Sequence, residues 1–234
     1  MKIKTIGSGS SGNCYLIDDG QTQLLLECGL PIKKIKAGCD YDFSRVAGCL
    51  ITHEHGDHAK AANDLMRAGV DVWMTEGTAR AAGADVYRLK LFKRIRPNDC
   101  YFTETIGTFT ILAFPVHHDA AEPVGYLIHS GATGEKLLYV TDTQYIDYRF
   151  RGLTHVMVEA NFSDDALADP DNDPRRHRLR RTHMSIENTL KMLQANDLSK
   201  CKRIYLIHLS HTNADAEEFV RRVETETGVP TSAA

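Results

Sequence analysis

The segment from Thr52 to His58, with the sequence THEHGDH, constrains this chain more than any other. It follows an apolar run typical of a short buried strand, and loops at the end of such a strand are common places for ligand sites. In an extended chain His53 and His55 point the same way, so both can bind one ion. Gly56 permits a tight turn that would direct Asp57 and His58 toward a second ion. The segment therefore predicts a two-metal site, and the alternative is a surface cluster of histidines on a loop.

Composition favours one compact enzyme domain over residues 1–234, with 42% hydrophobic and 25% charged residues. Strand-like runs cover 2–6, 13–18, 22–27, 46–52 and 71–75, and helical periodicity appears near 59–69. A second set of strand-like runs covers 108–116, 124–129, 136–141, 154–158 and 203–208, with amphipathic helices near 184–196 and 214–226. The pattern predicts an α/β or α+β fold.

The N-terminus enters a strand directly and has no apolar signal segment, and no run approaches the ~18 apolar residues needed to cross a bilayer. We therefore expect a soluble, cytoplasmic protein with no membrane contact. The six cysteines, at positions 14, 28, 39, 49, 100 and 201, form no Cys-x-x-Cys pair. They are predicted to be reduced thiols, several of them in the core.

The THEHGDH segment is the signature of the metallo-β-lactamase superfamily, which the chain resembles along most of its length. The resemblance implies a four-layer αββα sandwich and further ligands at His118 in FPVHHD, Asp142 in LLYVTDT and His208 in IYLIHLS. It implies His53, His55 and His118 on one metal. Asp57, His58 and His208 would bind the other, with Asp142 between the two. Zinc suits the imidazole-rich set, and manganese stays open because carboxylates also contribute.

Two divalent ions lower the pKa of a water held between them toward ~7, so hydrolysis is the expected reaction. His183 in THMS and Glu159 in VEAN resemble segments of the superfamily's phosphodiesterases, notably the transfer-RNA 3′-processing enzymes. There the histidine is thought to protonate the leaving oxygen while the glutamate orients it, which a poor alkoxide leaving group requires. His183, Glu159 and Asp57 are the predicted catalytic residues. The alternative makes His183 the first residue of a helix and Glu159 a solvated loop carboxylate.

Other branches fit less well, because zinc β-lactamases commonly carry cysteine where this chain has Asp142, and thioesterases append a helical domain after the last ligand. The nearest resemblance is to the anti-Pycsar family, through segments that include Glu27-Cys28-Gly29. It implies a homodimer that hydrolyses cyclic CMP, UMP, AMP and GMP and so counteracts cyclic-nucleotide anti-phage signalling. The alternatives are a 5′–3′ exonuclease of the YycJ (WalJ) branch, acting on DNA or RNA, and a non-catalytic metal-binding module.

A net charge of −3 disfavours a grip on long nucleic acid, which usually relies on a basic stripe. The exception is the run from Pro174 to Arg181, with arginines at 175, 176, 178, 180 and 181. It is either a solvated loop balanced by aspartates at 164, 165, 169, 171 and 173, or a segment that binds substrate phosphate or reaches across a dimer. A second open case is the glycine-rich loop from Gly7 to Asn13. It is a plain hairpin connection, or its amides face an anionic substrate or the ligand-bearing loops.

Overall fold

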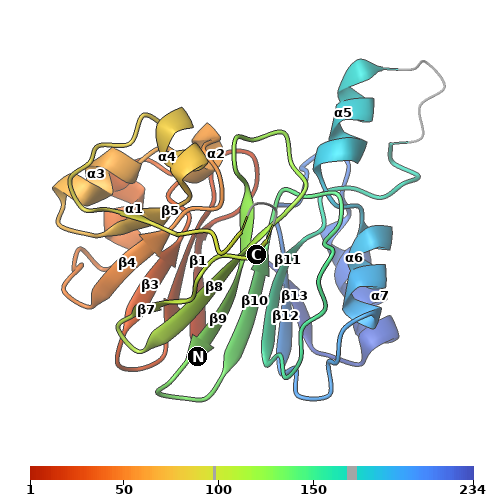
Figure 1. Cartoon of the computed structure of the whole chain (residues 1–234). Coiled ribbons are helices and arrows are strands. Elements are labelled where there is room, and N and C mark those ends of the chain that lie inside the picture. The colour runs from red at the N-terminus through yellow and green to blue at the C-terminus, as the bar shows by residue number, and fades with distance from the viewer. Residues whose placement is uncertain (97–98, 168–172) are drawn as a thin grey trace. The chain divides into compact units, whose positions relative to one another are not determined.

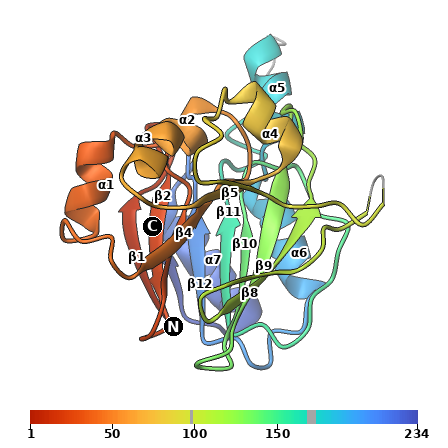
Figure 2. The same cartoon turned by 60° about the vertical axis from the view of Figure 1, so that its left-hand side comes forward.

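The computed structural model describes residues 1–96, 99–167 and 173–234 (Figures 1 and 2). The chain divides into two compact units, of which the first comprises Met1–Pro115 with Ala120–Glu135 and the second Val116–Asp119 with Lys136–Ala234. Both units combine strands with helices, as the sequence predicted. The expectation of a single domain stays a prediction.

The first unit contains a six-stranded sheet in the order β1-β2-β3-β4-β5-β6. Its strands are β1 (Lys2–Gly7), β2 (Cys14–Asp18), β3 (Gln23–Leu26), β4 (Val46–Leu50), β5 (Val72–Met74) and β6 (Leu89–Leu91). The strands from β3 to β6 run parallel, whereas β1, β2 and β3 pair antiparallel. Parallel strands align their carboxyl ends, so the turns after Leu26 and Leu50 leave from the same edge.

Four short helices accompany this sheet: α1 (Ile32–Gly38), α2 (Gly56–Ala59), α3 (Ala62–Arg67) and α4 (Glu76–Ala81). Their apolar residues join one cluster with side chains of the strands, in which Ile35 and Leu65 pack with Leu25, Cys49 and Val72. The helices therefore cover one face of the sheet. The α2 helix begins directly after His55 and carries Asp57 and His58, and its Ala59 packs in this cluster.

Three antiparallel strands complete the first unit: β7 (Glu104–Ile106), β8 (Phe109–Pro115) and β9 (Val124–Ser130). Asp19, in the turn after β2, joins them to the six-stranded sheet. Its Oδ2 accepts hydrogen bonds from the hydroxyls of Thr108 at 2.5 Å and Ser130 at 2.7 Å. Tyr126 adds a second link by donating its buried hydroxyl to the carbonyl of Ile51 at 2.5 Å.

The second unit contains four parallel strands, β10 (Lys136–Val140), β11 (His155–Glu159), β12 (Arg203–Ile207) and β13 (Thr231–Ala233). All five residues of β11 are buried, which is typical of a parallel strand covered on both faces. Three helices belong to this unit: α5 (Pro174–Thr182), α6 (Ile186–Gln194) and α7 (Ala216–Thr227). Ser185 caps α6 and Asp215 caps α7 through their side-chain oxygens.

The structure corrects two expectations from the sequence. The arginine run is not a loop, because residues 174–182 form α5, which begins with Pro174 at its first turn and Asp173 as its N-cap. His183 does not open a helix. It follows α5 as its C-cap, where its amide donates to the carbonyl of Leu179 at 2.9 Å, and α6 begins at Ile186. Asp169 and Asp171 lie outside the described residues.

All six cysteines are free thiols, and four of them are buried, in agreement with the prediction. Within the described ranges, no helix has both the length and the apolar character that a membrane span requires.

Candidate metal centre

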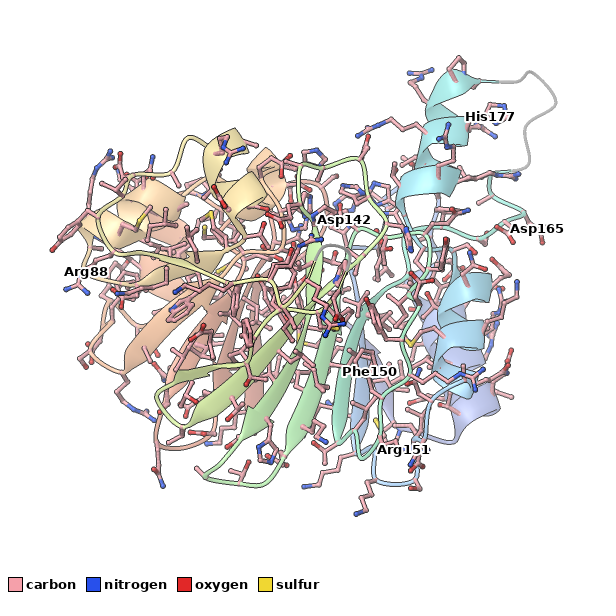
Figure 3. The ribbon with its side chains drawn as sticks, viewed as in Figure 1. Arg88, Asp142, Phe150, Arg151, Asp165 and His177 are labelled. Carbon is pink, nitrogen blue, oxygen red and sulfur yellow. The ribbon has the colours of Figure 1, made fainter. Side chains whose placement is uncertain are left out.

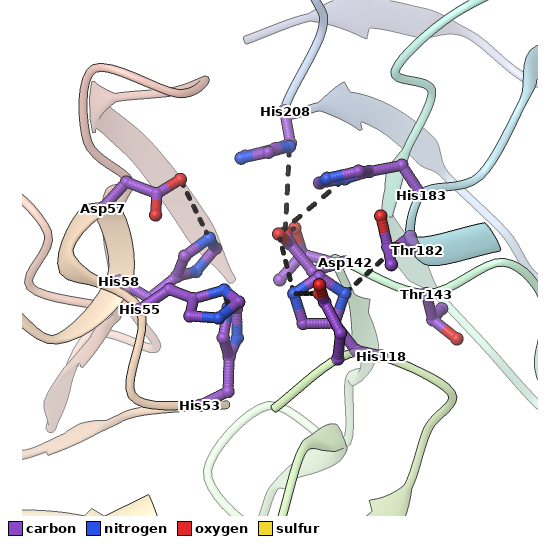
Figure 4. A network of polar contacts seen from close by, with 12 residues as sticks. His53, His55, Asp57, His58, His118, Asp142, Thr143, Thr182, His183 and His208 are labelled. Atoms are coloured by element: carbon purple, nitrogen blue, oxygen red, sulfur yellow. Dashed lines mark hydrogen bonds and ion pairs between the residues drawn. The ribbon is translucent and has the colours of Figure 1, made fainter. Parts of the chain in front are cut away.

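Four predicted ligands of the first unit lie together after β4 (Figure 4). His53 Nε2 lies 3.1 Å from His55 Nδ1, and the rings of His53 and His58 are 4.2 Å apart. Asp57 Oδ2 lies 3.4 Å from His58 Nε2. Imidazole nitrogens and carboxylate oxygens gathered this closely are the ligand types that bind zinc in proteins.

Backbone contacts fix α2, which carries Asp57 and His58. The amide of Asn13 donates to the Asp57 carbonyl at 2.8 Å, and the amide of Cys28 donates to the His58 carbonyl at 2.8 Å. At Gly29 a Cβ would lie only 1.7 Å from the Asp57 carbonyl oxygen, so only glycine fits there. The glycine-rich loop thus ends on the ligand-bearing segment, which was one of the roles left open by the sequence.

Glu27, directly after β3, lies behind the ring of His58. It is fully buried and adopts φ 62°, a conformation that residues with a side chain rarely take. Its carboxylate accepts a hydrogen bond from the amide of Thr52 at 3.2 Å and lies 3.6 Å from His58 Nδ1. A carboxylate behind a ligating histidine orients the ring and increases its basicity.

The remaining predicted residues lie together in the second unit. Asp142 follows β10, Glu159 ends β11 and His208 follows β12, so three adjacent parallel strands bring these side chains to one edge. Asp142 and His208 also have positive φ, at 47° and 53°. Asp142 Oδ2 lies 3.7 Å from His118 Nε2, and Oδ1 lies 3.7 Å from His208 Nδ1 (Figure 4).

His118 is held as a metal ligand would be. Its Nδ1 donates to the carbonyl of Thr182 at 2.9 Å, which leaves the lone pair on Nε2. A ligating histidine usually donates its other ring N–H to such a partner. Burial lowers the pKa of His118, although the nearby charge of Asp142 opposes this. The ring is therefore favoured in the neutral form that binds metal.

Glu159 and His183 form a buried pair. Glu159 Oε1 lies 2.6 Å from His183 Nδ1, and Oε2 accepts from the amides of Met184 at 3.1 Å and Thr143 at 3.3 Å. Burial acts to raise the pKa of Glu159, but the positive charge of His183 and the hydrogen bonds outweigh it and lower the pKa. Burial likewise acts to lower the pKa of His183, and the charge of Glu159 outweighs it and raises the pKa. Glu159 is thus not a solvated loop carboxylate.

Each unit therefore holds a cluster of the predicted ligands, and the side chains of each cluster are of the types that bind a divalent cation. In the second unit, ligand atoms of Asp142, Glu159, His183 and His208 all lie within 4.8 Å of one another. The sequence reasoning missed Thr182 and Asn161, whose amide donates to the His208 carbonyl at 2.9 Å. Only Asn161 carried a signal, since it directly follows the Glu-Ala segment.

Fold and ligand clusters together define a class, the metal-dependent hydrolases with a metallo-β-lactamase fold. Residues 30–209 match the family model described as "Beta-lactamase superfamily domain", and the chain belongs to this superfamily. A crystal structure of the metallo-β-lactamase fold protein YhfI from Bacillus subtilis matches with a TM-score of 0.74 at 17% identity, covering 99% of this chain and 95% of that one. The predicted fold is confirmed.

Two curated relatives match over most of their length. The chain is 29% identical to exodeoxyribonuclease YycJ of Bacillus anthracis, covering 91% of this chain and 84% of the relative. It is 30% identical to exodeoxyribonuclease WalJ of Streptococcus pneumoniae, covering 91% of this chain and 83% of the relative.

Proposed function

We propose that this chain is a phosphodiesterase that uses two divalent ions, with the end of a DNA strand as its first candidate substrate. The observation that carries the proposal is the buried hydrogen bond of 2.6 Å between Glu159 and His183. Hydrolysis of an ester with a good leaving group does not need a positioned acid, whereas the alkoxide that departs from a phosphodiester does. The pair supplies that acid.

The two clusters would serve one centre, as the resemblance to the superfamily implies. His53, His55 and His118 would hold one ion, Asp57, His58 and His208 the other, and Asp142 would bridge them. When bound, such ions supply an activated water and offset the charge that develops on the phosphoryl group. Zn²⁺ is the proposed metal, with Mn²⁺ as the alternative.

His183 acts on the leaving group in this proposal. Glu159 accepts the Nδ1 proton and fixes the ring, so Nε2, which has no hydrogen bond among the described residues, is available to the substrate. As the phosphorus–oxygen bond breaks, the Nε2 proton passes to the departing oxygen, and the imidazole becomes neutral. Asp57, the third predicted catalytic residue, is proposed to act as a ligand beside His58.

The substrate class rests on the relatives. Two exodeoxyribonucleases are 29% and 30% identical to this chain over most of its length, which supports DNA as the first candidate. The second candidate is a cyclic mononucleotide, and the net charge of −3 favours it because a small nucleotide needs little basic surface. The homodimer and the counteraction of anti-phage signalling belong to this second candidate.

The test is incubation of the purified protein, loaded with Zn²⁺ or Mn²⁺, with end-labelled DNA and RNA strands and with cyclic CMP, UMP, AMP and GMP. Shortened DNA with intact cyclic nucleotides supports the first candidate. Conversion of the cyclic nucleotides with intact strands supports the second. Bound metal without turnover of any substrate would reject both and leave a metal-binding module. The Asp142→Ala variant is the control for a contaminating nuclease.

A further inference from the structure

The second unit contains a pocket of about 700 Å³ that no step of the proposed reaction uses. One wall consists of His117, His118 and Asp119. The other wall is α5. Its residues His177, Arg178 and Arg181 follow Pro174 by three, four and seven positions, so all four lie on one face of the helix. Figure 3 marks His177 on this helix. The pocket therefore combines a candidate metal ligand with a basic helix face.

The positive charge of this pocket is only partly balanced. Arg178 donates to Asp119 Oδ2 through Nε at 2.8 Å and Nη2 at 2.7 Å, so these two charges offset each other. Arg181 is exposed, and among the described residues it forms no ion pair. A guanidinium without a carboxylate, on the wall of a pocket, is suited to a bidentate contact with a phosphate.

The composition of α5 points the same way. Its nine residues include five arginines and no acidic residue, and it has no apolar stripe that could be buried against the strands. A helix that is polar on all sides lies at the surface, where its arginines can contact an anion.

The last turn of α5 also contacts the candidate metal cluster. The Thr182 carbonyl, next to Arg181, accepts the hydrogen bond from His118 Nδ1 at 2.9 Å. A phosphate on Arg181 would therefore lie near the metals but not on them. A cyclic mononucleotide has a single phosphate, which the reaction needs at the metals, whereas a strand brings further phosphates on either side of the scissile one.

We propose that this α5 pocket binds the phosphate next to the scissile one in a single-stranded nucleic acid, with Arg181 as its principal contact. The inference rests on the proposed phosphodiesterase and narrows its substrate to a strand. It also answers the objection from net charge, because the five arginines of α5 form a local basic cluster although the whole chain has a net charge of −3. A volume of about 700 Å³ lies within the range of ~300–1,000 Å³ that ligand sites occupy.

Binding without turnover tests the pocket by itself. A fluorescent 12-nucleotide DNA is titrated into the protein with EDTA present, so no hydrolysis occurs, and anisotropy is measured at several salt concentrations. We expect Arg181→Gln to weaken binding about tenfold and to reduce the salt dependence by somewhat less than one ion. Arg181→Lys keeps the charge but not the two parallel N–H donors of the guanidinium, so its affinity for DNA should lie between those of the parent and Arg181→Gln. Arg221→Gln, an exposed arginine on α7, is the matched control.

Turnover then separates this inference from the proposed function. On the loaded enzyme, Arg181→Gln should raise KM for the strand about tenfold and leave kcat/KM for bis-p-nitrophenyl phosphate, which has one phosphate, within about twofold. Equal losses on both substrates, or no change in DNA binding, would overturn the pocket assignment even if hydrolysis occurs. Absence of hydrolysis with Arg181-dependent binding would reject the proposed function alone.

Discussion

A single buried side chain, Asp19, connects several segments of the first unit through hydrogen bonds. Its Oδ1 accepts from the amides of Gln21 at 3.0 Å and Thr22 at 2.9 Å, while Oδ2 binds the hydroxyls of Thr108 and Ser130. Burial acts to raise the pKa of Asp19, but these hydrogen bonds outweigh it and lower the pKa to about 2. The carboxylate thus stabilises the first unit as long as it is ionised.

Asp19→Asn should therefore lower the free energy of unfolding by about 2 kcal/mol at pH 7. Because the folded pKa lies below the ordinary value, this contribution is complete above pH ~4 and is lost as the pH falls toward 2. Urea unfolding of both proteins at pH 7 and pH 3 measures it. Asp40→Asn, at an exposed turn, should change stability by less than about 0.5 kcal/mol. Equal effects of the two substitutions would contradict the assigned role.

At His183 the prediction concerns the leaving group. His183→Ala should reduce kcat on a DNA strand by about 10²–10⁴-fold, since the departing alkoxide needs a proton. On a p-nitrophenyl phosphodiester, whose leaving group needs little protonation, the loss should be much smaller. Elemental analysis should give the same metal content for the variant and the parent protein. A loss of metal would make His183 a ligand, as its place in the cluster with Asp142 and His208 permits.

Among the elements, β11 links stability to pH in a different range. His155, at its start, is buried, and this burial, together with the positive charges of Lys202 and Arg203, lowers its pKa to about 4. The unfolded chain binds a proton at this side chain below pH ~6.5, whereas the folded protein resists it. The resulting stability is complete above pH ~6.5 and disappears as the pH falls to 4.

His155→Gln should flatten the fall in stability of the metal-free protein between pH 6.5 and 4 by roughly 3 kcal/mol. Denaturant unfolding at several pH values in this window measures the slope. His129→Gln, at an exposed position of β9, serves as the control for a substitution of histidine by glutamine. If stability falls with pH in the His155 variant as steeply as in the parent, other groups cause the loss of stability between pH 6.5 and 4.

The elements also show which parts of the fold the sequence could predict. Strands such as β4 and β12 are apolar runs bounded by polar turns, and they were predicted within one or two residues. The α5 helix was missed as a helix because five arginines leave no apolar periodicity to detect. Three-residue strands such as β6 and β13 are too short to show any period. At the site, side-chain ligands followed from their motif, whereas the Thr182 carbonyl is a backbone group and leaves no sequence signal.

At the scale of the whole molecule, the metal ions should control both activity and stability. Treatment with a chelator should abolish hydrolysis, and Zn²⁺ or Mn²⁺ should restore it. Because only the folded chain assembles the ligands, added metal should raise the melting temperature, with a gain of about 1.4 kcal/mol for each tenfold rise in metal above Kd. Differential scanning calorimetry of metal-free protein across a Zn²⁺ series measures this. Asp142→Ala should remove most of the dependence, and a variant that keeps it would show that the bridging assignment is wrong.

The predicted homodimer belongs to the same scale. Sedimentation equilibrium of the metal-loaded protein gives the mass directly, and a monomer at micromolar concentration would reject the dimer.

Glu27, Asp142 and His208 each turn the chain into the left-handed region immediately after a strand, a conformation that glycine or asparagine adopts more easily. Glycine or asparagine at these positions would lower the backbone strain. The strained residues are therefore kept only while their side chains are needed at the metal site. We therefore expect a descendant that no longer has a substrate to accumulate glycine or asparagine at these three positions first. Such replacements would identify, from sequence alone, homologues that have lost the activity.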